Sequence, residues 1–493
     1  MKTVIFLLSF LSISSFITAQ ECACTVSQVA SNTVVSSDLI VGEVIQVATT
    51  SELKSAISSA NQNGGNVTIL IEDGTYPIAS SASYPYITAS NVVFRSVSGN
   101  RDAVILTGTG MASQSGTENG IFAVGDNITI ADLTIRDVAN HGISVSGDNL
   151  FVHNVKIQDA FEQLLKGVSA NGGADNAVIQ CSLFEYTAGV GPQYYIGGID
   201  IHDGDGCLVR DNIFRNIASP SMSLAEHAVH FWNSSSDNIV ERNVIYNCDR
   251  GIGFGLGSSA SEGGIIRNNM IYNDGHHNFD DVGIGLETSP NTKVYNNTIY
   301  IDYQNAIEYR FAATTGVEII NNITNRRIRS RDGGVAEVRS NIEEVVDAWF
   351  VDLPAGDLRL ASAVAEIVDQ GENLGADVMY DLDKNLRGND GAIDLGSQEF
   401  GAVSTSLDDA FFDFGLTVYP NPSTHYLVIH VDARSSYDLS IWSIDQKLSY
   451  KQNLSTLHQG AYINTQEWMS GLYFGTITNA DGQRQVFKFS VKR

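Results

Sequence analysis

Apolar and polar residues alternate in seven short runs through the middle of the chain, and a period of two predicts β-strands. The runs are GISVS from Gly142, LLKGV from Leu164, GIDIH from Gly198, AVHFW from Ala228, GIGFG from Gly251, GIGLE from Gly283 and AIEYR from Ala306. Alternation directs one set of side chains into a shared core. The predicted core residues are Ile143, Leu165, Ile199, Val229, Ile252, Ile284 and Ile307, together with Val145, Ile201, Phe231, Phe254, Leu286 and Tyr309.

A second repeat has the form apolar-x-x-Asn-apolar and returns at intervals of roughly 22 to 34 residues, which is typical of solenoids. It occurs in VHNVKI, VRDNIF, VERNVI, IRNNMI, VYNNTI and IINNIT. Asparagines stacked on successive coils can hydrogen-bond to one another and tolerate left-handed backbone. We therefore expect one equivalent site on each coil to be occupied by Asn154, Asn212, Asn243, Asn269, Asn297 and Asn322.

The repeats, together with two flanking segments, resemble right-handed parallel β-helix proteins of the pectate-lyase-like superfamily. The first segment, SELKSAISSANQNGGNVTILIEDGTY, predicts a helix from about Ser51 to Asn61 followed by a strand and a turn, and the second is LRGNDGAIDLGSQEF. The resemblance implies an all-β fold with a right-handed parallel β-helix over residues 45–400. That architecture hosts lyases, hydrolases, epimerases and adhesins, so the resemblance alone does not give the reaction.

The repeat stops near Phe400, and GAVSTSLDDAFFDFG at 401–415 has the composition of a linker. Short alternating strands follow at 416–493 and predict a small β-sandwich. The segments YPNPS and SGLYF resemble the C-terminal sorting domain of type IX secretion in Bacteroidetes, which implies that the secretion machinery is a partner. An all-β carbohydrate-binding module is the competing interpretation.

The N-terminus reads as a secretory signal peptide at 1–19, with Lys2, an apolar run from Val4 to Leu11 and ITAQ at the cleavage site. We therefore expect a protein that is secreted or displayed at the cell surface. No later run reaches the length of about 18 apolar residues that a membrane helix needs.

The five cysteines are too few for a disulfide scaffold. Cys22 and Cys24, near the new N-terminus, can pair with a group outside the main body. Cys181, Cys207 and Cys248 are expected to be small buried thiols.

A formal charge of -27 argues against nucleic-acid binding. For an acidic ligand to bind, the protein would need a local cluster of positive side chains that overcomes the repulsion from its negative net charge. A monomer is expected.

Coils of a β-helix stack about 4.8 Å apart, so equivalent residues form ladders on the outer surface. The outward ladders are Ser144, Lys166, Asp200, His230, Gly253, Gly285 and Glu308, and then Ser146, Val168, His202, Trp232, Gly255, Glu287 and Arg310. The corner before each strand carries His141, Gln163, Gly197, His227, Arg250, Val282 and Asn305. The glycines predict a bare patch beside ionisable side chains, which is the shape of a groove.

Three coils have longer loops on the same side, just before the corner residues of their strands. These loops, TAGVGPQYYIG, ASPSMSLAEH and NDGHHNFDD, are predicted to form one wall of the groove. Tyr194, Tyr195 and Trp232 offer flat faces for sugar rings. HDGDG and HHNFDD offer cation ligands without the full spacing of a known site, so Ca²⁺ stays an open candidate cofactor. The cluster NRRIRSR can either grip an anionic polymer or balance neighbouring carboxylates.

Each member of the groove also has a structural interpretation. Lys166 and Asp200 can be a simple cross-strand ion pair, His227 and His230 ordinary surface histidines, and Arg250 a ligand of turn carbonyls. A lysine, an aspartate, a histidine and an arginine on four successive rungs nevertheless favour a functional site.

The predicted function is cleavage of a uronic-acid polysaccharide by β-elimination, which needs a base and a cation that neutralises the sugar carboxylate. We expect His230 or Lys166 to be the base, Arg250 with His227 to neutralise the carboxylate, and Asp200 to tune both. The remaining predicted substrate contacts are Gln163, Tyr194, Tyr195, His202, Trp232, Glu287, Glu308 and Arg310.

The arrangement resembles alginate- and chondroitin-type β-helix lyases in its Lys and Arg, although Lys166 and Arg250 lie three coils apart instead of about one. Hydrolysis needs two carboxyl groups roughly 5 to 9.5 Å apart, and Glu287 and Glu308 are at least three rungs from Asp200. Asp203 leaves a glycoside hydrolase open as an alternative, and a non-catalytic glycan-binding surface protein is the other.

Overall fold

The computed structural model describes most of the chain in two compact units, Met1–Ala402 and Val403–Arg493. The predicted signal peptide, Cys22 and nearly all of the predicted linker lie outside the described residues. The described residues are 24–34, 39–78, 85–112, 119–168, 173–275, 280–388, 392–401, 417–419, 423–430, 437–443, 448–454, 461–479 and 484–492.

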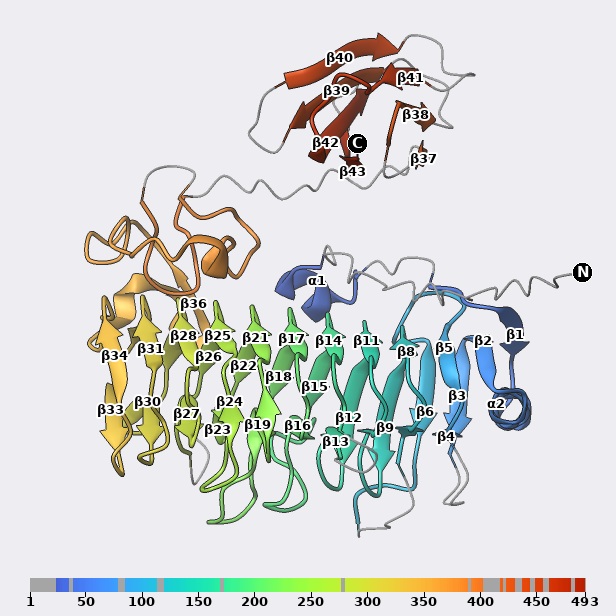
Figure 1. Ribbon diagram of the computed structural model, residues 1–493. Coiled ribbons are helices and arrows are strands. Elements are labelled where there is room, and N and C mark those ends of the chain that lie inside the picture. The colour runs from blue at the N-terminus through green and yellow to red at the C-terminus, as the bar shows by residue number, and fades with distance from the viewer. Residues whose placement is uncertain are drawn as a thin grey trace, which may run out of the picture. The chain divides into compact units, whose positions relative to one another are not determined.

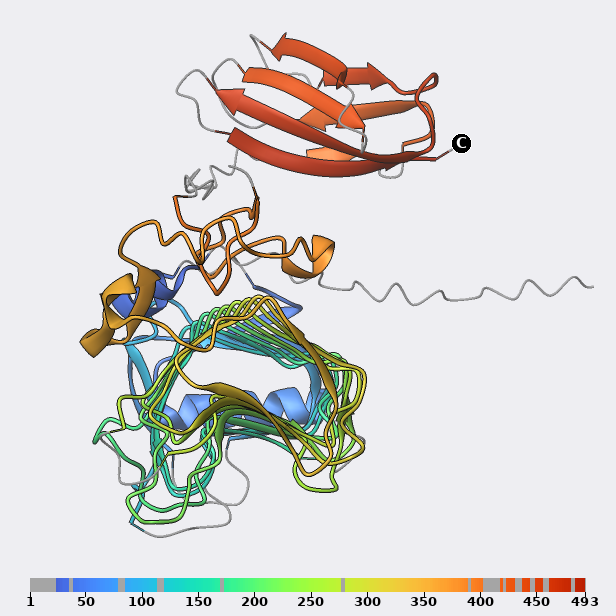
Figure 2. The same cartoon turned by 90° about the vertical axis from the view of Figure 1, so that its left-hand side faces the viewer.

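The first unit is a solenoid of three parallel sheets (Figures 1 and 2), as the sequence predicted. The first sheet contains β1 Glu43–Val47, β2 Gly65–Ile71, β5 Ser90–Ser96, β8 Ile128–Ala131, β11 Phe151–His153, β14 Val178–Gln180, β17 Leu208–Arg210, β21 Ile239–Glu241, β25 Ile265–Arg267, β28 Lys293–Tyr295, β31 Val317–Ile320 and β34 Ala336–Arg339. The second contains β4 Tyr86–Ile87, β7 Ile121–Ala123, β10 Ile143–Val145, β13 Leu165–Gly167, β16 Ile199–His202, β19 His227–Trp232, β23 Arg250–Phe254, β27 Ile284–Glu287, β30 Asn305–Arg310 and β33 Arg327–Arg331. The third contains β3 Gly74–Pro77, β6 Val104–Thr107, β9 Thr134–Val138, β12 Lys156–Ala160, β15 Leu183–Glu185, β18 Ile213–Arg215, β22 Val244–Tyr246, β26 Met270–Tyr272, β29 Thr298–Tyr300 and β32 Ile323–Thr324.

Two α-helices come from the first part of the chain: α2 Thr50–Asn63 lies at the N-terminal end of the solenoid, and α1 Val26–Ser31 packs on its middle coils beside β15 and β18 (Figure 1). Helix α2 realises the predicted helix, and its N-cap Thr49 accepts a hydrogen bond from the Glu52 backbone. Leu53 and Ile57 are buried in the solenoid core, so α2 closes its first coil (Figure 2). No helix in the described ranges has both the length and the hydrophobicity needed to cross a bilayer.

The core follows the predicted period of two. Ile143, Leu165, Ile199 and Val229 pair across neighbouring strands in one register. Every predicted core residue is at most 1% exposed except Tyr309, which is partly buried at the end of the row.

The asparagine ladder is confirmed for five of its six predicted members. From Asn212, each side-chain Nδ2 donates to the Oδ1 of the next asparagine at 2.9 to 3.0 Å, and the row ends at Asn341. The prediction was wrong for Asn154, which is one residue out of register. Asn154 has a φ of 52° and donates to Asp132, whereas Ser182 occupies the rung below Asn212.

The left-handed backbone belongs to the residue before each rung, such as Asn268, and not to the ladder residue itself. The left-handed turn of the backbone and the hydrogen bonds between coils therefore come from adjacent positions. One residue turns the chain, and the asparagine after it links the coils.

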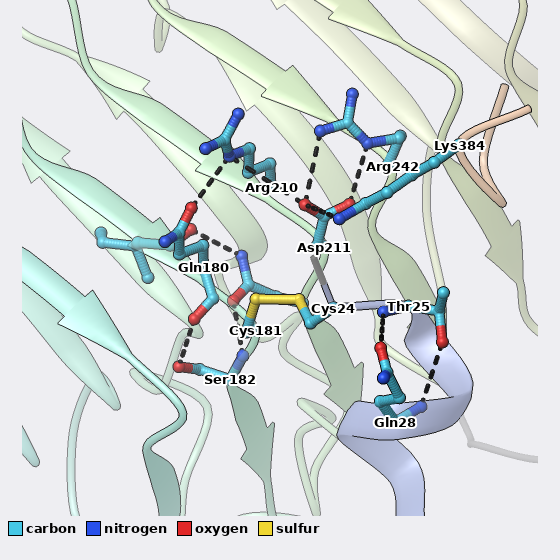
Figure 3. Close-up of a disulfide and its surroundings, with 12 residues drawn as sticks. Cys24, Thr25, Gln28, Gln180, Cys181, Ser182, Arg210, Asp211, Arg242 and Lys384 are labelled. Atoms are coloured by element: carbon cyan, nitrogen blue, oxygen red, sulfur yellow. Dashed lines mark hydrogen bonds and ion pairs between the residues drawn. A yellow bond between two sulfur atoms is a disulfide. The ribbon is translucent and has the colours of Figure 1, made fainter. Parts of the chain in front are cut away.

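A disulfide joins Cys24 to Cys181 and fixes α1 against the outside of the solenoid (Figure 3). The prediction of a free thiol was wrong for Cys181, while Cys207 and Cys248 are free and buried as expected. Val29 of α1 packs with Leu183 beside the disulfide.

Residues after β34 add no further coils in the described part of the chain. They include η1 Asp347–Trp349, β35 Phe350–Asp352, η2 Leu353–Ala355, β36 Asp357–Leu360 and η3 Gly375–Val378. This segment packs along the third sheet, where Ser397 hydrogen-bonds to Thr298 at 3.0 Å and the Arg387–Glu399 ion pair is buried. The described residues between β34 and residue 400 thus belong to the same compact unit as the solenoid but add no coil to it.

The second unit has two antiparallel sheets that share an apolar core, consistent with the predicted small β-sandwich. One sheet contains β37 Thr417–Tyr419, β38 Tyr426–His430 and β41 Ala461–Asn464. The other contains β39 Tyr437–Ser443, β40 Leu448–Leu454, β42 Gly471–Asn479 and β43 Arg484–Val491.

The first unit also contains one short pair of parallel strands outside the three sheets, β20 Ser235–Ser236 and β24 Ser261–Glu262.

Candidate functional site

Four neighbouring strands of the second sheet, β13, β16, β19 and β23, carry the candidate site. The register places Lys166 beside Asp200 and Asp200 beside His230, as the ladder predicted. His227 pairs with Arg250 at the corner. Strand pairing therefore brings these residues together from separate coils.

Asp200 is the centre of a polar cluster and is 3% exposed. Lys166 forms an ion pair with its Oδ2, and Lys166 Nζ lies 2.8 Å from Nε2 of His202. Trp232 donates its indole N–H to Oδ1 at 2.8 Å. Burial alone would raise the pKa of Asp200, but its contacts with His202 and His230 and the charge of Lys166 hold that pKa well below its usual range.

His230 lies under the surface with 1% exposure. Its Nε2 donates to the carbonyl of Gly255 at 3.2 Å, and its ring stacks on Trp232 with centroids 5.6 Å apart. His202 meets the other side of the cluster, with its ring edge-on to Trp232 at 4.2 Å. Of the two histidines, His202 reaches solvent, because 21% of its side chain is exposed.

The patch predicted to be bare is filled by His227. A Cβ on Gly253 would meet the imidazole of His227 at 2.6 Å, and one on Gly285 would lie 3.8 Å from its Nε2. The glycines therefore make room for a buried ring. Burial, helped by the neighbouring His230 and Arg250, lowers the pKa of His227 well below its usual range.

Glu226 joins the cluster, although the sequence analysis missed it. Its Oε2 lies 3.9 Å from Nδ1 of His230, and 24% of its side chain is exposed. It stands one residue before β19, so the period-two pattern did not reach it. The signal that could have found it is EHAVH, in which an acid and two histidines fall at 226, 227 and 230.

Arg250 pairs with Asp281, whose Oδ2 lies 3.4 Å from its Nε. About a quarter of each side chain is exposed, so a ligand can reach the guanidinium. Asp281 belongs to the loop NDGHHNFDD, of which residues 276–279 lie outside the described ranges.

Three predicted substrate contacts lie apart from the histidine cluster. Arg310 is paired with Glu287 at 2.9 Å, and Glu308 with Arg331 at 2.8 Å. Glu308 is three rungs from His230, or roughly 14 Å by strand spacing. These residues neutralise one another near the end of the solenoid and leave no free charge for a sugar at the cluster.

Gln163 and the two tyrosines have opposite environments. Gln163 is fully buried, and neither of its amide atoms has a hydrogen-bond partner among the described residues. Tyr194 and Tyr195 are 53% and 43% exposed, as expected of residues that offer a flat face to solvent.

The cation ligands predicted in HDGDG are used within the chain. Asp205 accepts a hydrogen bond from Ser236 at 2.8 Å, and its backbone N–H donates to Asp175 at 2.9 Å. Among the described residues, the group of three possible metal ligands that lies close together is Glu226, His227 and His230.

Two family profiles match the chain. The right-handed β-helix region matches residues 119–276 and 197–341, and the secretion system C-terminal sorting domain matches residues 417–492. No curated protein matches.

Several solved structures are similar to the chain. A pectate lyase, Pel9A, shares 15% identity with a TM-score of 0.43, covering 77% of this chain and 100% of that one. An alginate lyase from Paenibacillus sp. str. FPU-7 shares 16% identity with a TM-score of 0.33, covering 60% and 99%. An endo-xylogalacturonan hydrolase from Aspergillus tubingensis shares 10% identity with a TM-score of 0.31, covering 65% and 99%.

The coiled sheets and the first profile define a right-handed parallel β-helix protein. The chain is a β-helix protein that carries a type IX secretion sorting domain at its C-terminus. It is therefore exported to the cell surface or released.

Proposed function

We propose that the β-helix unit binds an acidic polysaccharide and cleaves it by β-elimination. The observation that carries the proposal is that Lys166 contacts both Asp200 and His202, which brings an ammonium group within 2.8 Å of an imidazole. β-Elimination needs a cation for the sugar carboxylate and a base for the C5 proton, and both must reach one sugar. We assign Lys166 as the cation and His202 as the base, because the two groups already lie side by side.

The geometry supports His202 as the base in place of His230. His230 is 1% exposed and its Nε2 is bonded to Gly255, whereas His202 reaches solvent beside Trp232. In the free protein, Lys166 donates to Nε2 of His202. An arriving sugar carboxylate would attract the ammonium group and release Nε2 to accept a proton.

The chemical step then balances as follows for a uronic acid linked through its C4 oxygen. Nε2 of His202 takes the C5 proton, and the electrons of that bond form a double bond between C4 and C5. The bond from C4 to the leaving oxygen breaks, and that oxygen takes a proton from water. Asp200 would hold Lys166 in position through their ion pair, and Arg250 would bind the carboxylate of a neighbouring sugar.

Hydrolysis is the second candidate, because the structure adds a carboxylate that the sequence analysis did not consider. Oδ1 of Asp200 and Oε2 of Glu226 lie 3.5 and 3.9 Å from Nδ1 of His230, so they are less than about 8 Å apart. A glycoside hydrolase needs its two carboxyl groups roughly 5 to 9.5 Å apart, and this upper limit lies within that range. Asp200 is a poor general acid, however, because its pKa is held well below the usual range, so Glu226 would have to donate the proton.

The test is incubation with a panel of uronic-acid polysaccharides, following both the ultraviolet absorbance of unsaturated ends and the release of reducing ends. We expect both signals to rise together, and His202→Gln and Lys166→Met each to lower turnover by at least about 100-fold. His425→Gln is the matched control, since His425 is exposed in the sorting domain.

Reducing ends without absorbance would replace elimination by hydrolysis, in which case Glu226→Gln should be inactive. Retention of a polymer without any cleavage would identify a glycan-binding protein. Full activity of the His202 variant would refute the assignment of the base.

A further inference from the structure

Glu226, His227 and His230 form a compact cluster of groups that bind metals. One ligand atom from each lies within 4.8 Å of the others. The two imidazole centroids are 4.5 Å apart, and both histidines are buried. His227 and His230 belong to β19 and Glu226 directly precedes that strand, so the backbone of one short segment fixes their spacing.

The hydrogen bond of His230 determines which of its nitrogens is available. The Gly255 carbonyl can only accept, so Nε2 carries a proton, and the tautomer that binds a metal would present the lone pair of Nδ1 to the cluster. A metal-binding histidine commonly donates its other N–H to a backbone carbonyl in this way. Nδ1 lies 3.5 Å from Asp200 and 3.9 Å from Glu226, which is too long for a good hydrogen bond to either carboxylate.

His227 is also held as a ligand would be. Its Nδ1 is buried and has no hydrogen bond within the described part of the chain. Gly253 provides the space for its ring, since any larger residue there would displace it.

We propose that Glu226, His227 and His230 bind a divalent transition-metal ion of the zinc class. Two imidazoles and one carboxylate are the donor set that zinc accepts, and nitrogen donors disfavour Ca²⁺. Ligand atoms about 2.1 Å from zinc lie roughly 3.4 Å apart, so the cluster needs to contract by about 1 Å through small side-chain rotations.

Three protein ligands leave a fourth position on the ion. Asp200 lies beside His230 but is already bonded to Lys166 and Trp232, so it would orient the cluster from outside. Glu226 is the partly exposed member, which places the open position toward solvent. The inference does not depend on the proposed chemistry, because binding is measured without any polysaccharide.

The experiment uses the full chain after removal of metals with a chelator. Titration with Zn²⁺ is followed by calorimetry, and titration with Co²⁺ by visible absorption, which reports nitrogen ligands in a tetrahedral site. We expect one site that Ca²⁺ does not compete for. Glu226→Gln and His227→Ala should each weaken Zn²⁺ binding by at least about 10-fold.

The matched control is His141→Ala, which changes a partly buried histidine–glutamate pair next to strands β10 and β13 of the same sheet. His141 lies 3.6 Å from Glu162 but belongs to no group of three close metal ligands among the described residues, so its loss should leave the site intact. Failure of the wild-type chain to bind Zn²⁺ or Co²⁺, or binding unchanged in both cluster variants, would overturn the proposal. Because the Co²⁺ spectrum is recorded on the wild-type chain, the test holds even if one variant does not fold.

Discussion

Replacing Lys166 by methionine tests whether the centre of the site is a buried ion pair. The side chains of Lys166 and Asp200 are only 8% and 4% exposed, so the substitution leaves a carboxylate charge with no adjacent cation in a buried position. Removing one partner of a buried pair costs about 3–5 kcal/mol. Asp200 keeps the indole N–H of Trp232 and the contact with His202, so we expect a value near the lower end, about 3 kcal/mol.

The pair can be measured directly with a double-mutant cycle. Lys166→Met, Asp200→Asn and the double variant are unfolded in urea and followed by circular dichroism. We expect the two single losses to exceed the double loss by about 2 kcal/mol, because removing both charges leaves neither one unpaired. Lys293→Met is the matched control, since Lys293 and Asp377 form a half-exposed pair at 2.7 Å that should contribute less than about 1 kcal/mol.

The reasoning would be refuted if Lys166→Met cost no more than Lys293→Met, or if the two single effects simply added. In either case Asp200 would be solvated in solution, and the site would lack the buried charge pair described above. The same variants serve the activity test, so stability and turnover can be compared on one set of proteins.

Three further predictions concern the scaffold. Asn269→Ala should lower the free energy of unfolding by about 3 kcal/mol, because the buried Asn269 side chain both donates and accepts hydrogen bonds in the ladder. Asn63→Ala, at an exposed position of α2, is the control and should change that free energy little; chemical unfolding measures both variants. Burial raises the pKa of Asp249 from 3.8 to about 6, so the folded state holds its proton more tightly and stability should fall as pH rises through that range. Asp249→Asn should remove up to about 3 kcal/mol of this pH-dependent loss of stability. The prediction would be contradicted if the free energy of unfolding of the variant depended on pH as that of the wild type does. Replacing Cys24 and Cys181 by serine should free α1 to proteolysis while the coils stay folded, and limited digestion followed by mass spectrometry reads this out.

The repeating part of the site could be predicted because the pleat of a strand fixes which face a residue occupies. Lys166, Asp200 and His230 were therefore aligned correctly from spacing alone. Asn154 was misplaced because the asparagine of VHNVKI stands one position earlier in its coil than the asparagine of VRDNIF, so matching on asparagine shifts the register by one. A single residue type cannot distinguish a rung from the turn position next to it.

The remaining features lie where no period applies. Glu226 comes from a loop, and Cys24 from an N-terminal segment that crosses the outside of the coils. The position of His227 depends on the absence of a side chain at Gly253. From the sequence alone, that glycine predicted a bare patch of surface. Side chains from neighbouring coils fill such spaces, so the sequence predicts the members of the cluster better than its packing.

The Cys24–Cys181 bond also changes how the solenoid responds to force. A repeat protein normally unravels from its ends, one coil at a time, because each coil touches only its neighbours. Here the bond spans 157 residues, so tension applied at the N-terminal tail is delivered to the middle of the stack and bypasses the first coil. The coils between the two cysteines form a mechanically closed ring, which an exported protein retains as long as its surroundings stay oxidising.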